Sequence, residues 1–348
     1  MTQVKKSKKL LHAVDLFSGC GGLSLGLKKA GFNVAAAVEI DSKAQETYRL
    51  NHPSVRLYPH DIRALDPAQV LRDAGLRPGQ LDLLAGCPPC QGFSRLRTKN
   101  QQTSVDDERN NLVSDFLRFI KVMKPKTVML ENVPALENDT RFLKMRRAIH
   151  ALGYETVVHV LDAADYSVPQ RRKRLIMLAS IVHTPLLAEK ALTRITVRKA
   201  LAGLDSPKNT SDKLHGMGEN RSLEIRKLIS LIPKDGGSRR DLPQEYQLEC
   251  HKRTDGFSDV YGRMAWDMVS PTITSGCSNP SKGRFLHPSQ NRTITLREAA
   301  VLQGFPRNYR FNVDHGKEAI ALMIGNALPP PFIAAHAGAL KQGLENIS

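Results

Sequence analysis

Residues 11–22 read LHAVDLFSGCGG, an apolar run that passes directly into a glycine-rich turn. The run 11–17 predicts a buried β-strand, because it is short, mostly apolar and bounded by glycines. The following LSLGLKKAG (23–31) predicts a helix that stops at Gly31. A strand, a glycine turn and a helix in this order begin an α/β unit. Glycines at such a turn let the backbone approach a ligand at the positive end of the helix.

The same alternation of strands and helices continues to about residue 185. Further strands are predicted at 34–40, 55–62, 81–86, 127–133, 154–162 and 174–181, and helices at 42–51, 67–75, 110–124 and 140–152. Alternating strands and helices are typical of a mainly parallel sheet with helices on both faces. The sequence therefore predicts an α/β fold with a doubly wound, mainly parallel sheet.

The pattern changes after about residue 185. From there to about 295 the chain is polar, basic and rich in glycine and proline, and its apolar periodicity is weak. Order returns in TLREAAVLQGF (295–305) and in a last helix over 330–344. We therefore expect a second, smaller and irregular unit with nucleic-acid contacts.

The charge of the chain points to a polyanionic partner. Its 348 residues carry a formal net charge of +17, which favours nucleic acid as the partner over a merely basic soluble surface. No apolar run of the length of a membrane helix is evident, and the N-terminal MTQVKKSKKLLHAVDLF breaks at Asp15, unlike a signal peptide. We expect a cytoplasmic protein without a membrane partner, associated with the prokaryotic nucleoid through DNA.

The cysteines do not form a disulfide pattern. Their number is odd and the chain is long, so a disulfide framework is not expected. Cys87 and Cys90 have the C-x-x-C spacing of a zinc or redox site, which is one alternative for this stretch. No second C-x-x-C or H-x-x-x-H completes a zinc set, and we expect no metal.

Acidic residues follow the second and third predicted strands. Glu39 comes about twenty residues after the glycine turn, where an acid holds ribose hydroxyls in nucleotide-binding sheets. Asp61 ends the third strand, where a carboxylate can accept a hydrogen bond from an adenine amino group. Together with Gly19 and Gly21 these residues predict an adenosyl site along one edge of the sheet. The alternative is that both acids are solvated loop carboxylates.

The stretch GCPPCQGFSRLR (86–97) places Cys90 after the fourth strand, at the same edge. Two prolines fix the backbone there, and positive neighbours would make the thiol a nucleophile; a small buried cysteine is the alternative. Glu131 ends the adjacent strand and would lie close to Cys90. Arg172 and Arg174 alternate at the start of a strand, so both would point into one cleft, or else belong to a solvated basic run.

Motifs in a fixed order span nearly the whole chain: DLFSGCGG (15–22), PPCQGFS (88–94), ENV (131–133), QRRKR (170–174), TLREAAVLQGFP (295–306) and IGNALPP (324–330). The ordered set resembles the DNA (cytosine-5) methyltransferase family of the bacterial restriction-modification type. The resemblance implies the S-adenosylmethionine-dependent methyltransferase fold. It implies a catalytic domain of residues 1–185 plus 318–348 and a target-recognition domain of residues 186–317.

The resemblance also implies a role for each matched residue. S-adenosylmethionine would be bound by Phe17, Gly19, Gly21, Glu39, Ile40, Asp61, Ile62, Pro89 and Asn326. Cys90 would add to cytosine C6, Glu131 would serve N3, Arg174 would meet O2, and Arg172 would support the site. DNA contacts are expected from Gln91, Ser94, Arg97, Arg239, Arg240 and Thr272, and for the two adjacent arginines a plain solvated pair is the alternative. Because C-terminal Asn326 would complete the donor pocket, the last helix should pack on the first domain.

The resemblance implies duplex DNA as the partner of a monomeric enzyme, with a cognate restriction endonuclease encoded separately as a further partner. One alternative is an RNA cytosine-5 methyltransferase of the same fold, although the Cys-Phe-Thr tripeptide of the tRNA-modifying relatives does not occur in the chain. Another is a catalytically silent nucleic-acid-binding module that keeps only the donor pocket. The intact set of Cys90, Glu131 and Arg174 argues against silence.

Overall fold

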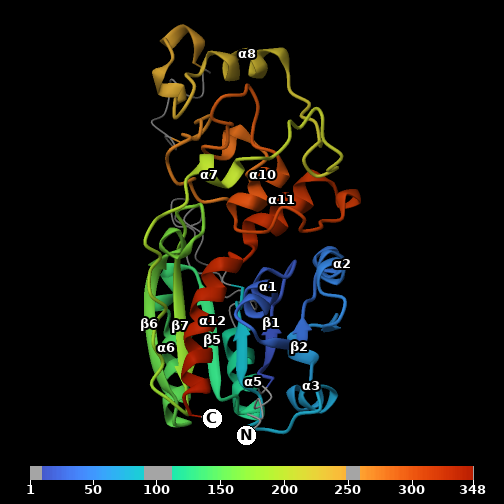
Figure 1. Ribbon diagram of the computed structural model, residues 1–348, viewed down its shortest axis with the longest axis vertical. Coiled ribbons are helices and arrows are strands. Elements are labelled where there is room, and N and C mark those ends of the chain that lie inside the picture. Colours follow the sequence, from blue (N-terminus) through green and yellow to red (C-terminus); the bar gives the residue numbers. More distant parts are fainter. Residues whose placement is uncertain (1–9, 90–111, 248–258, 348) are drawn as a thin grey trace, which may run out of the picture.

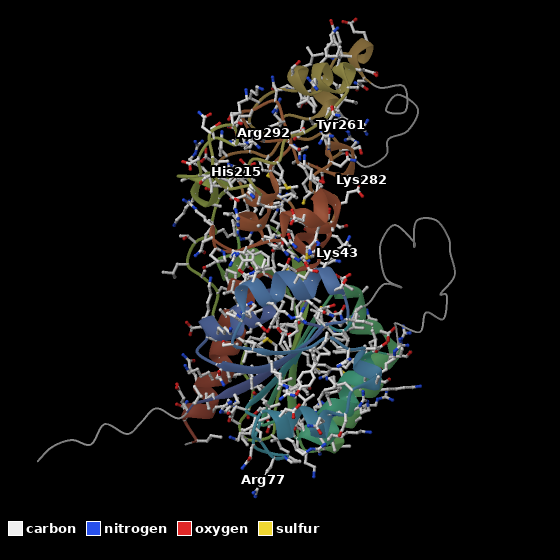
Figure 2. All side chains as sticks on the ribbon, turned by 90° about the vertical axis from the view of Figure 1, so that its right-hand side faces the viewer. Lys43, Arg77, His215, Tyr261, Lys282 and Arg292 are labelled. Atoms are coloured by element: carbon white, nitrogen blue, oxygen red, sulfur yellow. The ribbon has the colours of Figure 1, made fainter. Side chains whose placement is uncertain are left out.

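The computed structural model describes residues 10–89, 112–247 and 259–347. It has two units, one above the other in Figure 1: a sheet with its helices, and a smaller, mainly irregular unit that carries α7, α8, α10 and α11. Figure 2 shows Lys43 where the units meet and Arg77 at the far end of the sheet unit. The two-part organisation agrees with the change of pattern in the sequence.

The first unit contains a seven-stranded sheet with the order β3-β2-β1-β4-β5-β7-β6. Its strands are β1 His12–Leu16, β2 Asn33–Val38, β3 Arg56–Tyr58, β4 Leu83–Gly86, β5 Thr127–Asn132, β6 Glu155–Asp162 and β7 Lys173–Ser180. β1 to β5 are parallel to one another. The predicted doubly wound, mainly parallel α/β fold is confirmed, with β3 shorter than the predicted strand 55–62.

Strand β7 runs antiparallel to both of its neighbours, β5 and β6. The connection 163–172 that precedes it is too short for the crossover that a parallel pairing requires, so the chain turns straight back. The first residues of β7 therefore lie at the carboxyl edge of β5, where Glu131 pairs with Ile176 and Asn132 with Leu175. This reversal brings Arg172 and Arg174 to the edge that carries Glu131.

Helices cover both faces of the sheet: α1 Gly22–Lys29, α2 Ser42–Asn51, α3 Pro67–Asp73, α5 Leu112–Met123, α6 Thr140–Ala151 and α12 Pro330–Glu345. One buried cluster includes Val70 of α3, Phe116 of α5 and Ile149 of α6. The other includes Leu27 of α1 and Phe332 of α12. In α5 the apolar residues recur at helical spacing, which gives this helix a continuous buried face.

The C-terminal helix returns to the sheet unit, as predicted (Figure 1). Gly26 of α1 lets α12 approach, because a Cβ there would lie 2.5 Å from Ile333 Cβ and 2.8 Å from Pro330 O. By length and composition the run Val313–Glu345 could cross a membrane, but 61% of its apolar window is buried inside the protein. Buried core helices pass the same test, so this run is weak evidence for a membrane span.

The second unit has short helices, α7 Val197–Leu201, α8 Leu223–Leu231, α10 Leu296–Leu302 and α11 Gly316–Asn326. Its main core includes Leu302 and Ile324 and also takes in Cys20 and Ala44 of the sheet unit. A smaller cluster packs under α8. The chain also forms the 3-10 turns η1 Ile62–Ala64, η4 Pro134–Asn138, η5 Ala163–Tyr166, η6 Arg239–Asp241, η7 Gln244–Tyr246, η8 Pro280–Lys282 and η9 Val313–His315.

Candidate functional site

A cleft of about 1040 Å³ opens at the carboxyl edge of the sheet, where the two units meet. The ends of β1, β2, β4 and β5, the start of β7, and the end of α11 all contribute to it. Of the predicted site residues, the cleft is lined by Phe17, Gly19, Glu39, Ile40, Asp61, Ile62, Pro89, Glu131, Arg172, Arg174, Thr272 and Asn326. These predicted residues thus lie together at the carboxyl edge of the sheet.

The glycine turn is fastened by Glu39. Its Oε2 accepts a hydrogen bond from the Gly19 N–H at 2.7 Å, and its Oε1 accepts one from the Asp41 N–H at 2.8 Å. Gly19 has a φ of 54°, and the space that a Cβ would occupy there is open. Burial raises the pKa of Glu39, and the two backbone N–H groups oppose this shift. The carboxyl is therefore fixed at the turn, and Glu39 also lines the cleft.

Asp61 lies beyond β3, at the start of η1, and not at the end of a strand. Arg63 Nη2 is 2.6 Å from Asp61 Oδ2, and the Arg63 backbone N–H donates to Oδ1 at 2.9 Å. These hydrogen bonds from Arg63 lower the pKa of Asp61. Arg63 also lines the cleft, and the sequence analysis did not identify it.

Two more of the residues predicted to bind S-adenosylmethionine line the cleft and are exposed. The apolar side chain of Ile40 is 65% exposed and lines the cleft. Asn326 is exposed at the end of α11. Gly21, in contrast, does not line the cleft; it sits at the start of α1 with a φ of 97°.

Glu131 is the most deeply placed carboxyl of the cleft, with 2% exposure. Its Oε1 lies 3.1 Å from Arg174 Nε, and the Cys87 thiol donates to its Oε2 at 3.2 Å. Burial raises the pKa of Glu131, against the lowering effect of Arg174 and then Arg172. Burial, together with Glu131, also raises the pKa of the Cys87 thiol well above its ordinary value. Cys87 is thus a protonated hydrogen-bond donor in this structure.

Arg172 is buried and joins three segments of backbone. Its Nη1 donates to Ile273 O at 2.9 Å and its Nη2 to Gly325 O at 2.9 Å. Burial lowers the pKa of Arg172 to about 9, and Arg174 adds to the shift. The geometry fits the supporting position predicted for Arg172, with Arg174 as the arginine next to Glu131. Gln170 has a comparable part, since it bonds both Leu302 O and Ile273 N.

The predicted residues Cys90, Gln91, Ser94 and Arg97 lie outside the described residues. The chain that leads to them is held by β5, because Asn132 Nδ2 donates to Pro88 O at 2.8 Å. Pro89, the last described residue before Cys90, lines the cleft. The ENV motif thus fixes the chain just before Cys90 as well as supplying Glu131.

The predicted DNA contacts of the second unit differ in exposure. Thr272 lines the cleft, and its hydroxyl donates to Arg171 O at 2.6 Å. Arg240 is exposed, whereas the side chain of Arg239 is only 5% exposed. The DNA contacts expected of these two arginines stay predictions. The two are consecutive residues of the turn η6, which turns them to different sides. Among the residues that the structure describes, no group of three or more His, Cys, Asp or Glu could hold a metal ion.

Comparison with known proteins decides the family. Residues 11–342 match the family described as C-5 cytosine-specific DNA methylase. The chain belongs to this family. It is 34% identical to the type II methylase M.HgiDII of Herpetosiphon aurantiacus over 96% of both chains. It is 32% identical to the type II methyltransferase M1.HphI of Haemophilus parahaemolyticus, over 95% of this chain and 86% of the relative.

Solved structures share the fold at lower identity. A putative DNA modification methyltransferase encoded in an Escherichia coli prophage matches with a TM-score of 0.74 and 24% identity, over 96% of this chain and 99% of that chain. The Dnmt2 methyltransferase of S. pombe matches with a TM-score of 0.62 and 19% identity, over 97% and 99%. These structures confirm the methyltransferase fold. The family and the type II relatives identify a DNA (cytosine-5-)-methyltransferase, as predicted.

Proposed function

We propose that the protein transfers the methyl group of S-adenosylmethionine to C5 of a flipped-out cytosine in a specific duplex DNA sequence, through a covalent bond between Cys90 and C6. The observation that carries the proposal is the single cleft at the strand ends. It joins the glycine turn and Ile40 on one side to Glu131 and Arg174 on the other. The residues proposed to bind the methyl donor and those proposed to bind cytosine thus line the same cleft.

The donor side of the cleft fits an adenosyl group. Ile40 offers an exposed apolar surface for the adenine ring, and the open space at Gly19 leaves room for the backbone to approach the ligand. Glu39 and Asp61 offer carboxylates for the ribose hydroxyls and the adenine amino group, with Phe17, Gly21, Ile62, Pro89 and Asn326 completing the proposed set. S-adenosylmethionine would supply an electrophilic methyl group on a sulfonium. The Arg63 guanidinium, now on Asp61, would share that carboxylate with the ligand.

The acceptor side supplies the chemistry that cytosine needs. C5 alone is too weak a nucleophile, so the Cys90 thiolate would first form a bond to C6. The C5–C6 double bond would shift to C4–C5, which makes the ring an enamine, and the electron pair of the C4–N3 double bond would go to N3. Burial raises the pKa of Glu131, which would serve N3 as a protonated or hydrogen-bonding carboxyl, and Arg174 would donate to O2. C5 would then take the methyl group with the C4–C5 electron pair, and the electrons of the broken sulfur–methyl bond would stay with the donor sulfur. Finally a base removes the C5 proton, the double bond re-forms, and the C6–S bond breaks to release the thiolate.

The proposed reaction on duplex DNA requires base flipping, because a cytosine that stays stacked in the duplex cannot enter the cleft. Gln91, Ser94 and Arg97 would contact DNA near the base, with Thr272 and Arg240 from the second unit. We propose residues 1–185 plus 318–348 for catalysis and residues 186–317 for target recognition, although Ile320 and Ile324 of α11 pack in the core of the second unit. The names of the type II relatives support a restriction-modification context. We propose in addition a monomeric enzyme in the prokaryotic cytoplasm, with a cognate endonuclease encoded separately.

The test is incubation with donor labelled on its methyl group and with either duplex DNA or tRNA. We expect label in DNA alone, and bisulfite sequencing of that DNA should then show methylcytosine at one recurring sequence. Label that appears only in tRNA, or on adenine, would contradict the proposal.

A further inference from the structure

Two buried side chains grip the carbonyl groups of the glycine turn. The Tyr309 hydroxyl donates to Cys20 O at 2.6 Å, and His52 Nε2 lies 3.1 Å from Gly21 O. The two side chains also meet each other, with His52 Nε2 at 3.2 Å from the Tyr309 oxygen. Both carbonyls belong to the turn whose Gly19 lines the donor side of the cleft. Neither Tyr309 nor His52 lines the cleft itself.

The hydrogen bonds fix the proton positions. Lys28 Nζ lies 3.2 Å from His52 Nδ1, and an ammonium can only donate, so Nδ1 accepts. Burial, and then Lys28, lower the pKa of His52 to about 4, so the ring is neutral and its proton is on Nε2. That N–H is shared between Gly21 O and the Tyr309 oxygen, which leaves the Tyr309 proton for Cys20 O. Lys28 thus donates to His52, and His52 and Tyr309 donate to the carbonyl groups of the turn.

His52 and Tyr309 pack so closely on Gly21 that no side chain fits there. A Cβ at Gly21 would lie 2.5 Å from His52 Nε2 and 2.6 Å from the Tyr309 oxygen, and the φ of 97° is one that other residues rarely adopt. The turn therefore takes its shape from two side chains, and not from its own glycines alone.

Tyr309 comes from the second unit. It follows α10 and stacks on Phe305, with ring centroids 4.5 Å apart, and on Phe311 at 5.5 Å. Arg297 of α10 donates to Tyr309 O at 2.7 Å, so the backbone of Tyr309 is also held. All three rings belong to the core that includes Leu201 and Met264 of the same unit. The position of the Tyr309 hydroxyl is therefore set by the second unit.

We infer that Tyr309, with His52, is a positioning residue for the methyl donor: the second unit reaches across to hold the donor-binding turn in its competent shape. The inference rests on the proposed donor site. When the hydroxyl is removed, the turn populates other shapes, and the apparent donor affinity falls in proportion to the competent fraction. The coupling also works in reverse, so bound donor should stabilise the seating of the Tyr309 segment on the sheet unit.

The test compares Tyr309→Phe with Tyr154→Phe. Tyr154 is a matched control, because it is equally buried, donates its hydroxyl to a backbone carbonyl, Pro125 O, and does not line the cleft. Binding of S-adenosylmethionine and of S-adenosylhomocysteine is measured by calorimetry without DNA. We expect Tyr309→Phe to bind both about three- to tenfold more weakly than wild type, the factor that corresponds to one net hydrogen bond, and Tyr154→Phe to bind as wild type does.

Kinetics separate positioning from simple loss of folded protein. Tyr309→Phe should raise the KM for the donor and leave kcat at saturating donor within about twofold, whereas partial unfolding would lower kcat at unchanged KM. If Tyr309→Phe proves unfolded by circular dichroism, His52→Leu tests the second contact of the same turn with the same expected result.

Each outcome is decisive. Wild-type protein that binds no donor overturns the proposed donor site and this inference with it. Wild-type protein that binds donor, with equal affinity in the folded Tyr309→Phe or His52→Leu protein, overturns the inference alone. Equal weakening by Tyr154→Phe would also overturn it, because the effect would then follow from lost stability anywhere in the unit.

Discussion

Glu131 shows how one side chain obtains its chemistry from its position. As the last but one residue of β5 it is buried by the sheet, and the reversed strand β7 brings Arg174 to one oxygen while the β4 end brings Cys87 to the other. Burial outweighs the arginines, so its pKa is raised. In the proposed mechanism this carboxyl would serve the ring nitrogen that gains negative charge.

We predict that Glu131→Gln lowers the single-turnover rate of methyl transfer by roughly a hundred- to ten-thousandfold, because a positioned acid is worth about that much. Donor affinity should stay near wild type. Glu137→Gln is the control, since this carboxyl is exposed and comes from η4 just after the strand. A Glu131→Gln protein with wild-type single-turnover rates would remove Glu131 from the mechanism.

The burial of Asp15 leads us to predict that the free energy of unfolding depends on pH. It is fully buried in β1 and accepts from Ser24 Oγ at 2.6 Å, and burial raises its pKa from 3.8 to about 8. Because the folded state binds this proton more tightly than the unfolded state, its stabilising effect is complete below about pH 4. It is lost progressively as pH rises toward 8.

Asp15→Asn, which keeps the acceptor for Ser24 and cannot ionise, should therefore gain stability relative to wild type as pH increases from 5 to 9. Urea denaturation at several pH values measures the difference. A difference that is constant across this range would show that Asp15 does not hold a proton in the folded protein.

At the scale of elements, the close contact of α1 with α12 joins the two ends of the chain. We predict that Gly26→Ala destabilises the protein by about 1–3 kcal/mol, because its Cβ would overlap Ile333 and must push the helices apart. Gly338→Ala in α12 is the matched control. It has open space around the new Cβ, and it should stabilise the helix by roughly 0.5–1 kcal/mol. Equal thermal shifts for the two variants would contradict the packing account.

How far the elements could be predicted depends on how local their causes are. The glycine turn, the apolar face of α5 and the strand-end carboxyls follow from short-range pattern and parallel topology. The apolar pattern of β7 does not predict that it runs antiparallel to its neighbours. Its direction follows from the short 163–172 connection, which cannot form a crossover. Long-range contacts such as Tyr309 to Cys20, and the Cys87 bond to Glu131, had no sequence signal. The burial of Arg239 had no sequence signal either, because residues of an irregular unit follow no apolar period.

At the scale of the whole molecule, the two units divide the work in the proposed account. We predict that exchanging residues 186–290 for the equivalent segment of a relative with a known site transfers the methylated sequence with the segment. Base contacts, worth about 1–3 kcal/mol each, come from side chains that reach base edges, whereas phosphate contacts carry no sequence information. Bisulfite sequencing is the readout. A methylation pattern that stays with residues 1–185 would contradict this division.

The central claim is that the thiol of Cys90 bonds to cytosine C6 during methyl transfer. A duplex that carries 5-fluorocytosine at the methylated position cannot lose its C5 substituent, so the enzyme should stay bound to it. After incubation with donor, mass spectrometry of the digested complex should find the methylated nucleotide on Cys90, with the adduct kept in Cys87→Ser and absent in Cys90→Ser. An adduct on Cys87, an adduct that survives Cys90→Ser, or methylated fluorocytosine DNA without any covalent protein would contradict the account.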